Sequence, residues 1–128
     1  MRVLVDSSVW IDYFKNDNKS HKLDSMLEDK KIVICDVILA ELVPFLEIKK
    51  QRQVINLLYE IDKLLLHINW QQIMKMQLTA LQNGINGIGI LDLIIAQNAL
   101  QNNCSIYSFD KHFKFIGEIF DLKTIEIV

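Results

Sequence analysis

The sequence predicts an α/β protein, a three-layer α/β/α domain with a central, mostly parallel sheet of four to five strands. Short apolar runs recur along the 128 residues and alternate with longer segments in which apolar residues have helical spacing. Strands separated by helices favour parallel pairing, because parallel neighbours need a crossover connection. One Pro and four Gly leave no stretch typical of a flexible linker, so residues 1–128 are expected to form a single domain.

The first strand and the residues that end it organise the chain. Residues 3–5 are apolar and β-branched, too short a run for a helix and typical of a buried parallel strand. Asp6 ends this run, and Ser7 and Ser8 then supply N-cap chemistry for a helix over 9–14. The carboxyl end of a buried strand is where open α/β sheets bind ligands, although helix capping explains Asp6 as well.

One more strand–helix unit, flanked by further helices, follows in the first half of the chain. Asp36 comes after the second apolar run and is expected to cap the next helix rather than to bind a ligand. Pro44 is expected to kink or end that helix early, because proline lacks an amide donor and clashes with the preceding turn. The expected elements are a polar turn over 15–20, a helix over 23–30, a strand over 32–35, a helix over 37–46, a basic turn over 49–52 and a helix over 54–61.

The second half continues the alternation around a glycine-rich connection. Residues 84–89 do not match the spacing of a phosphate loop or a dinucleotide fingerprint, so they are interpreted as a helix stop and a loop. Asn69 is placed to cap the helix that precedes this connection. The expected elements are a strand over 64–68, helices over 70–83 and 91–103, a strand over 105–108, a short helical turn over 110–115 and an edge strand over 124–128.

The charge of the chain excludes one mode of nucleic-acid binding. The formal net charge is −2, so bulk basicity does not attract a phosphate backbone. Metal ions held by carboxylates are the alternative, since they bridge to phosphate oxygens. The basic residues Lys49, Lys50, Arg52, Lys111 and Lys114 are candidates for phosphate contacts, although each is also explained as part of a solvated face.

The composition is that of a globular protein in a reducing compartment. Hydrophobic residues make up 51% of the chain and charged residues 23%. No run reaches the roughly 20 apolar residues of a membrane span, and Asp6 and Asp12 interrupt any signal-peptide core. Cys35 and Cys104 are too few for a disulfide framework and lack the spacing of a zinc site, so both are expected to be core residues of a cytoplasmic protein.

Two acids lie in apolar surroundings. The helical neighbours of Glu41, three and four positions away, are mostly apolar, and so are those of Asp92. Burying an unpaired carboxylate is costly, so such residues normally find a cation, a hydrogen-bond donor or a metal. Most other acids lie among polar neighbours or at element ends and are expected to be solvated: Asp17, Asp24, Glu28, Asp29, Glu47, Glu60, Asp62 and Glu126.

Four acids are expected to meet at one edge of the sheet. Asp110 follows the fourth apolar run much as Asp6 follows the first, although it is also suited to cap a helix. Adjacent parallel strands would bring both acids to the same edge, and Glu41 and Asp92 raise the number of candidate acids to four. Clustered carboxylates repel one another unless divalent cations neutralise them, and oxygen ligands without a Cys/His set favour Mg²⁺ or Mn²⁺ over zinc.

Four short segments carry a resemblance to a known family. They are VLVDSSVWI at 3–11, ILAEL at 38–42, LDLIIA at 91–96 and SFDKHF at 108–113, and they occur in this order along the chain. Together they resemble the PIN-domain nucleases, and most closely the VapC toxins of prokaryotic toxin–antitoxin pairs. The resemblance covers essentially the whole chain and implies a PIN-like fold.

The resemblance also implies a metal site. Asp6, Glu41, Asp92 and Asp110 match the acidic quartet with which the family holds one or two Mg²⁺ or Mn²⁺ ions. Ser8 matches the family's small hydroxyl residue near the site, where it would bond a carboxylate or a water, although a helix cap explains it equally well. The family often has a further acid two positions after the last quartet acid.

The family's further acid is replaced by His112 in this chain. Its side chain is expected to contact phosphate or, more simply, to pack. The implied activity is metal-dependent endoribonucleolytic cleavage of tRNA, rRNA or mRNA that leaves a 5′-phosphate and a 3′-hydroxyl. The implied partners are a second copy in a homodimer and a cognate VapB-like antitoxin, which could dock on the apolar helices over 37–46 and 54–66 unless these are core.

Three other protein classes are alternatives to a PIN-domain nuclease. A receiver domain needs an acidic pair after the first strand and an aspartate at the end of the third, and this chain has neither. A haloacid-dehalogenase-like phosphatase needs an acid two residues after the first, where Ser8 stands. The remaining alternative is a catalytically inactive PIN-fold module that binds RNA or an antitoxin.

Overall fold

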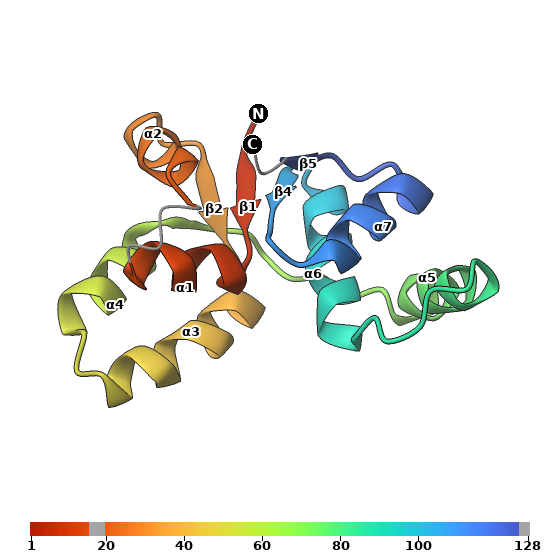
Figure 1. Cartoon of the computed structure of the whole chain (residues 1–128), viewed down its shortest axis with the longest axis horizontal. Helices are drawn as coiled ribbons and strands as arrows, with labels where there is room; N and C mark the ends of the chain where they lie inside the picture. The colour runs from red at the N-terminus through yellow and green to blue at the C-terminus, as the bar shows by residue number, and fades with distance from the viewer. Residues whose placement is uncertain (16–19, 126–128) are drawn as a thin grey trace.

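The computed structural model describes residues 1–15 and 20–125, which form a five-stranded parallel sheet covered by helices (Figure 1). The strands are β1 (Val3–Val5), β2 (Ile32–Ile34), β3 (Asp62–Lys63), β4 (Ser105–Tyr107) and β5 (Thr124–Ile125). The helices are α1 (Ser7–Lys15), α2 (Lys22–Glu28), α3 (Asp36–Ile48), α4 (Arg52–Glu60), α5 (Trp70–Gln82), α6 (Ile90–Gln101) and α7 (Lys111–Phe120). The strand order is β3–β2–β1–β4–β5, and each neighbouring pair is parallel.

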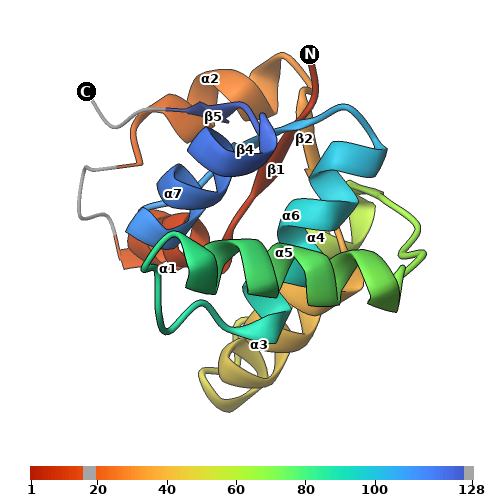
Figure 2. The same ribbon diagram turned by 90° about the vertical axis from the view of Figure 1, so that its right-hand side faces the viewer.

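Helices α1–α4 lie on one side of the sheet and α5–α7 on the other (Figures 1 and 2). The chain proceeds from β1 outward to β2 and β3, and then returns to add β4 and β5 beyond β1. Because crossovers between parallel strands are right-handed, reversing the direction of travel moves the helices to the opposite face. The predicted three-layer α/β/α arrangement is confirmed.

The three central strands are buried along their whole length. Every residue of β1, β2 and β4 is buried, in agreement with their continuous apolar runs. Helix α6 is also buried on nearly all sides, since the seven consecutive residues from Leu93 to Ala99 are buried. The polar residues of α6 therefore need partners inside the protein.

The early end expected at Pro44 is wrong, because α3 continues to Ile48. Leu42 and Leu46 are buried on either side of the proline, so packing in the core stabilises both halves of the helix. The expected cap is displaced by one residue, since Cys35 occupies the N-cap position and Asp36 lies in the first turn.

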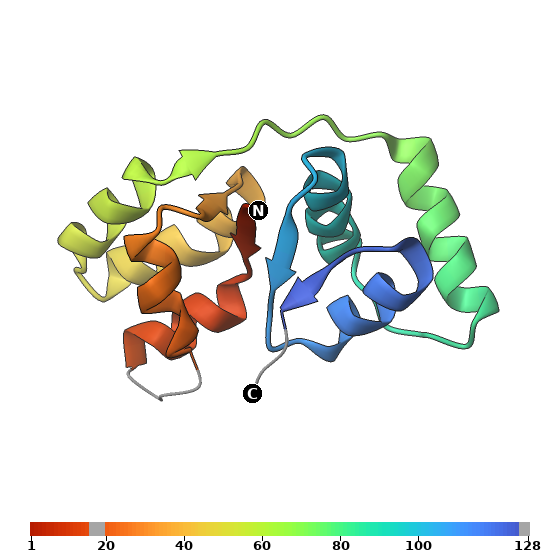
Figure 3. The same cartoon turned by 90° about the horizontal axis from the view of Figure 1, so that it is seen from above.

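The expected strand over 64–68 is also wrong, because β3 consists of Asp62–Lys63 and the chain then leaves the sheet. The backbone N–H of Leu64 still donates to the carbonyl oxygen of Ile34 at 2.8 Å. Further along, side chains of α6 replace strand pairing, since Asn98 Nδ2 donates to the carbonyl oxygen of Leu65 at 2.9 Å. Figure 3 shows this extended segment, in yellow-green, running from β3 to α5.

Helix α7 is longer than the helical turn expected over 110–115, because it extends to Phe120. Gly117 allows this, since a Cβ there would lie 2.7 Å from the carbonyl oxygen of Leu122, on the connection to β5. The edge strand expected over 124–128 is described only at β5, and its last three residues lie outside the described part of the chain. Residues 16–19 of the expected polar turn lie outside it as well.

Other helix ends agree with the sequence. The Oδ1 atom of Asn69 accepts from the backbone N–H of Gln72 at 3.1 Å, as predicted for the cap of α5. Gly84 and Gly87 have φ of 73° and 85°, a backbone region that favours glycine, and they lead the chain out of α5. No described helix is long and apolar enough to cross a bilayer.

Candidate active site at the carboxyl edge of the sheet

The candidate site lies where the chain reverses direction between β1 and β4. These two strands are neighbours although they are far apart in the sequence, with Val3 opposite Ser105 and Val5 opposite Tyr107. The helices that follow them, α1 and α7, lie on opposite faces of the sheet (Figures 1 and 2). A reversal of this kind opens a crevice at the carboxyl ends of the strands, the usual place for ligands in open α/β sheets.

Asp6, the first residue after β1, is a buried carboxylate held by two hydroxyl groups. It is 6% exposed, and its backbone N–H donates to the carbonyl oxygen of Tyr107 at 2.9 Å. Its Oδ2 accepts from Ser8 Oγ at 2.8 Å and from Ser108 Oγ at 2.9 Å. These bonds compensate part of the cost of burying the carboxylate.

Ser8 and Ser108 also connect the turns that follow β1 and β4. Ser8 Oγ accepts from the backbone N–H of Phe109 at 3.1 Å, and Ser108 Oγ accepts from that of Asp110 at 3.0 Å. The contacts of Ser8 are therefore those of a residue that positions Asp6, and not those of a simple helix cap.

Two serines near the site were missed by sequence reasoning. Ser108 directly follows β4 and precedes Asp110 by two positions, which is the reverse of the order of Asp6 and Ser8. That mirrored Ser-x-Asp pattern at the end of a strand was the available signal. Ser7 donates a side-chain hydrogen bond to Glu41, and nothing in its spacing to that acid indicated this contact.

Glu41 reaches the site from α3, which packs against α1. Loss of hydration raises the pKa of Glu41 above its ordinary value, and the charges of Asp6 and Asp92 raise it further. The residue is nevertheless exposed, whereas its apolar helical neighbours predicted a more apolar surrounding. The reason is that, on the same face of α3, Val37 is only partly buried and Phe45 is exposed.

Asp92 lies in the first turn of α6, with 26% of its side chain exposed. Loss of hydration raises its pKa, and the negative charges of Asp110 and Asp6 add to this effect. His112 acts in the opposite direction and lowers the pKa. Raised pKa values of two acids in one cluster are the result expected when like charges are held together.

Asp110 is both the N-cap of α7 and a member of the acidic cluster. Its Oδ1 accepts from the backbone N–H of His112 at 2.9 Å. The imidazole Nδ1 of His112 lies 3.5 Å from the same oxygen and 3.8 Å from Asp92 Oδ2. His112 thus contacts two carboxylates and does not merely pack against apolar groups.

Electrostatic effects on the pKa values of Glu41 and Asp92 connect the four predicted acids, which come from four different parts of the chain. Within the described residues, no Lys or Arg forms an ion pair with any of them. Donor atoms of Asp92, Asp110 and His112 lie within 4.8 Å of one another, close enough to share one ion. Carboxylate oxygens assembled in this way are a donor set that suits a hard divalent cation.

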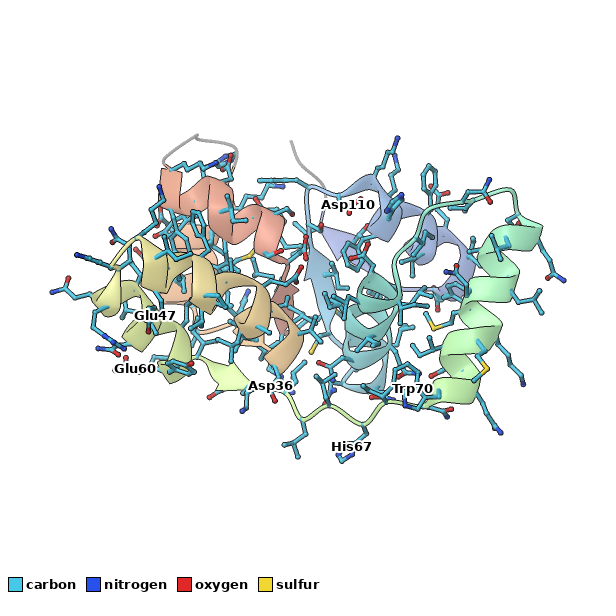
Figure 4. All side chains as sticks on the ribbon, turned by 90° about the horizontal axis from the view of Figure 1, so that it is seen from below. Asp36, Glu47, Glu60, His67, Trp70 and Asp110 are labelled. Atoms are coloured by element: carbon cyan, nitrogen blue, oxygen red, sulfur yellow. The ribbon has the colours of Figure 1, made fainter. Side chains whose placement is uncertain are left out.

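The acids expected to be solvated provide a contrast. Glu47 forms an exposed ion pair with Arg52 at 3.3 Å. Asp36, which was expected not to bind a ligand, pairs with Lys63 at 3.1 Å. Figure 4 shows Asp110 near the middle of the molecule and Glu47 at one end, far from the acidic cluster.

A cleft of about 560 Å³ opens beside the acids, between α7 and the β4–β5 edge. Its lining includes Ser108 and Asp110 of the site and the basic residues Lys111 and Lys114. These two lysines therefore bring positive charge next to the carboxylates. The basic turn over 49–52 lies instead at the far end of α3 from β1 (Figure 1).

Comparison with known proteins identifies one matching family model, the PIN domain, over residues 3–119. No curated protein matches the sequence. Among solved structures, the chain is similar to VapBC2 from Rickettsia felis, crystallised with a DNA fragment from the promoter, with a TM-score of 0.76, 19% identity and 98% of each chain covered.

Two further solved structures have the same fold. VapBC-1 from nontypeable Haemophilus influenzae aligns with a TM-score of 0.71 and 23% identity over 98% of each chain. FitAcB from Neisseria gonorrhoeae aligns with a TM-score of 0.70 and 20% identity, covering 97% of this chain and 96% of the other.

Proposed function

The chain belongs to the PIN-domain family, and on this premise we propose that it is a metal-dependent endoribonuclease, the toxin of a VapBC-type toxin–antitoxin pair. The observation that carries the proposal is the convergence of Asp6, Glu41, Asp92 and Asp110 at the sheet reversal with no Lys or Arg ion pair in the described residues. A purely structural cluster would be expected to recruit cationic side chains, since unpaired like charges destabilise the fold.

The residues present fit a divalent cation. The raised pKa values of Glu41 and Asp92 have mutual repulsion among their causes, and a bound cation would remove that repulsion. Asp6, Glu41, Asp92 and Asp110 would supply oxygen ligands, which suit Mg²⁺ and Mn²⁺. When bound there, such an ion screens the phosphate charge, lowers the pKa of water and stabilises the leaving oxygen.

The chain's own residues provide positioning and proton transfer. Asp6 or Asp110 is placed to orient the attacking water or to accept its proton. Ser8 and Ser108 hold Asp6 through their hydroxyl groups, so its carboxylate is fixed before substrate arrives. Hydrolysis of the bond between phosphorus and the 3′ oxygen then leaves a 5′-phosphate and a 3′-hydroxyl.

The RNA strand would approach along the cleft beside α7. Lys111 and Lys114 line this cleft next to Asp110, at a position suited to contacts with backbone phosphates. Phosphate contacts position a strand without reading its bases, so tRNA, rRNA and mRNA all remain within the proposed substrate class.

The proposed partners are a VapB-like antitoxin and a second copy of the chain. The similarity to VapBC2 and VapBC-1 supports an antitoxin, and exposed apolar residues on α3 and α4 offer it a surface. Ile48 is 79% exposed, Leu57 61% and Tyr59 62%, so these helices are not wholly accounted for by the core. An RNA substrate and two buried, unpaired cysteines agree with action in the cytoplasm.

The experiment that tests the proposal is cleavage of total cellular RNA by the purified protein with Mg²⁺, Mn²⁺ or EDTA. Asp6→Asn and Asp92→Asn variants run alongside, and Asp62→Asn in the edge strand β3 is the matched control. Circular dichroism establishes that each variant is folded. Discrete fragments that require the metal, persist in the control and vanish in both site variants are expected.

Two results would reject the proposal. Cleavage that survives EDTA or both site substitutions would place the activity elsewhere or in a contaminant. Absence of cleavage in every condition, with antitoxin carry-over excluded by mass spectrometry, would favour the inactive PIN-fold module that binds RNA or an antitoxin.

A further inference from the structure

His112 occupies a position in the acidic cluster that the proposed oxygen-only metal site does not use. Its side chain is 25% exposed and lies between the carboxylates of Asp92 and Asp110. The N-cap of α7 fixes this placement, because the backbone N–H of His112 donates to Asp110 Oδ1. The imidazole therefore enters the cluster on a rigid helix start and not on a loop.

The distances around the imidazole differ from those of ordinary hydrogen bonds. His112 Nδ1 is 3.5 Å from Asp110 Oδ1 and 3.8 Å from Asp92 Oδ2, whereas N–H···O bonds span roughly 2.7–3.2 Å. Neighbouring donors of an octahedral ion at about 2.1 Å lie about 3.0 Å apart and opposite donors about 4.2 Å apart. The observed separations lie between these values, and donor atoms of Asp92, Asp110 and His112 all lie within 4.8 Å of one another, close enough to share one ion.

We propose that His112 is a nitrogen ligand of the metal site and that it makes the site prefer Mn²⁺ to Mg²⁺. This inference rests on the proposed metal-dependent function and specifies the ion that serves it. A ligating imidazole is neutral, so the site carries one negative charge less than it would with a fifth carboxylate.

The chemistry of the two ions gives the direction of the preference. Mg²⁺ is a hard cation that takes oxygen ligands and gives up its waters reluctantly. Imidazole nitrogen suits transition metals, and Mn²⁺ is the one among them that also favours carboxylate and water oxygens. A site made mostly of carboxylates with one nitrogen therefore matches Mn²⁺ better than Mg²⁺.

A second histidine provides a matched control. His67 is exposed on the extended segment between β3 and α5, where its carbonyl oxygen accepts from Gln101. Figure 4 shows His67 and Asp110 on opposite sides of the molecule. Substitution of His67 removes an imidazole from the protein and leaves the cluster unchanged.

The test is pulsed electron paramagnetic resonance of Mn²⁺ added to the purified metal-free protein. Hyperfine coupling from an imidazole nitrogen is expected in the wild type and in His67→Asn, and it should be absent in His112→Asp and His112→Ala. Competition with Mg²⁺ is followed by the signal of free Mn²⁺. The preference for Mn²⁺ should fall at least about tenfold in His112→Asp. Even residues that only hydrogen-bond to a metal ligand change metal affinity by about this much, and loss of a ligand should not have a smaller effect.

The outcomes separate this inference from the proposed function. Mn²⁺ that binds without nitrogen coupling, and binds more weakly in Asp92→Asn, overturns the role of His112 and leaves a carboxylate metal site. A preference for Mn²⁺ unchanged in a folded His112→Asp protein overturns it as well. Mn²⁺ that does not bind, or binds equally in Asp92→Asn, overturns both the inference and the proposed metal-dependent function.

Discussion

Helix α6 carries polar side chains in both of its halves, and their surroundings are opposite. In the acidic end, Asp92 in the first turn faces the carboxylates of Asp6 and Asp110, which raise its pKa. In the amide end, Gln97 is 2% exposed and its side chain is fully paired with the start of α5. Its Nε2 donates to the carbonyl oxygen of Asn69 at 3.1 Å, and its Oε1 accepts from the same residue's N–H at 3.1 Å.

The comparison shows that burial alone does not separate structural from functional polar residues. Asn98, which is 1% exposed, ties the segment after β3 to α6 by donating to the carbonyl oxygen of Leu65. The amide of Gln97 finds complementary partners and therefore stabilises the fold, whereas Asn98 pairs through its Nδ2 and its buried Oδ1 has no hydrogen-bond partner among the described residues. The acids have hydroxyl, backbone N–H and imidazole partners but no Lys or Arg ion pair in the described residues, so their mutual repulsion reduces stability in a way that a bound cation would reverse.

The largest expected effect comes from neutralising the acidic end. Asp92→Asn and Asp110→Asn should each lower RNA cleavage at least about 100-fold, about 2.7 kcal/mol in the barrier, because each removes a proposed metal ligand. The melting temperature should stay constant or rise, since repulsion falls and Asn still caps α7. Single-turnover kinetics measure cleavage, and calorimetry measures the melting temperature. Loss of activity together with unfolding would contradict the claim that these acids serve function and not stability.

The amide end should respond in the opposite sense. Gln97→Leu keeps the size of the side chain but leaves the N–H of Asn69 without its partner and removes one of the two donors to its carbonyl oxygen, so the free energy of unfolding should fall by about 2 kcal/mol. Urea denaturation measures this loss. Gln101→Leu, which removes one bond from an exposed side chain, is the control and should cost less than about 1 kcal/mol. Equal losses in the two variants would contradict the assignment of Gln97 as a structural residue.

Ser108→Ala tests the residue that sequence reasoning missed. Asp6 then keeps one of its two hydroxyl donors, so cleavage should fall roughly tenfold, about 1.4 kcal/mol, by loss of positioning. The free energy of unfolding should change by less than about 1 kcal/mol. Ser25→Ala on the exposed face of α2 should change neither quantity. A Ser108→Ala protein with full activity would show that Ser8 alone positions Asp6.

The smallest effect is a dependence of stability on pH in the metal-free protein. A carboxyl whose pKa is higher folded than unfolded binds its proton more tightly when folded, so its contribution to stability is greatest at low pH. For Glu41 and Asp92 that contribution is lost as pH rises from the ordinary values, 4.5 and 3.8, through the raised ones. Above this range, Glu41→Gln should have a higher melting temperature than the wild type, because the substitution removes a repelled charge. The difference should be only roughly 2–4 °C, since solvent screens the exposed side chain.

The pH experiment has a matched control in Glu60→Gln at the end of α4, labelled in Figure 4, where the wild-type curve should be retained. Added Mn²⁺ or Mg²⁺ should raise the melting temperature of the wild type more than that of Glu41→Gln. A wild type that becomes more stable than Glu41→Gln as pH rises would show that the acid is stabilised and not strained in the folded protein.

The fold class could be predicted from the sequence, and so could the positions of Asp6 and Asp110 after the first and fourth apolar runs, because these features rest on local patterns. Apolar runs mark the buried strands, and an acid at the end of a run is visible in the chain. The positions at which helices and strands end were less predictable. Pro44 lies inside α3 because packing of Leu42 and Leu46 outweighs the lost hydrogen bond, and packing is not a property of the local sequence.

Contacts between distant segments account for the other differences. The apolar run over 64–68 resembles a strand, yet the carbonyl oxygens of Leu65 and His67 accept hydrogen bonds from side chains of α6. Asn98, the donor to Leu65, lies 33 residues later in the sequence. Ser108 enters the site only because β4 lies beside β1. Local sequence patterns contain no information about contacts between residues that are distant in the sequence.

The pairing of β1 with β4 has a consequence for the synthesis of the protein. Val3 and Ser105 are register partners, and Asp6 and Asp110 meet only across that pairing. A nascent chain that still lacks β4 also lacks Asp110, which follows β4, and contacts of such long range form slowly. Under the proposed function, the ribosome completes nearly the whole toxin before any of it can cut RNA, which gives the antitoxin time to bind.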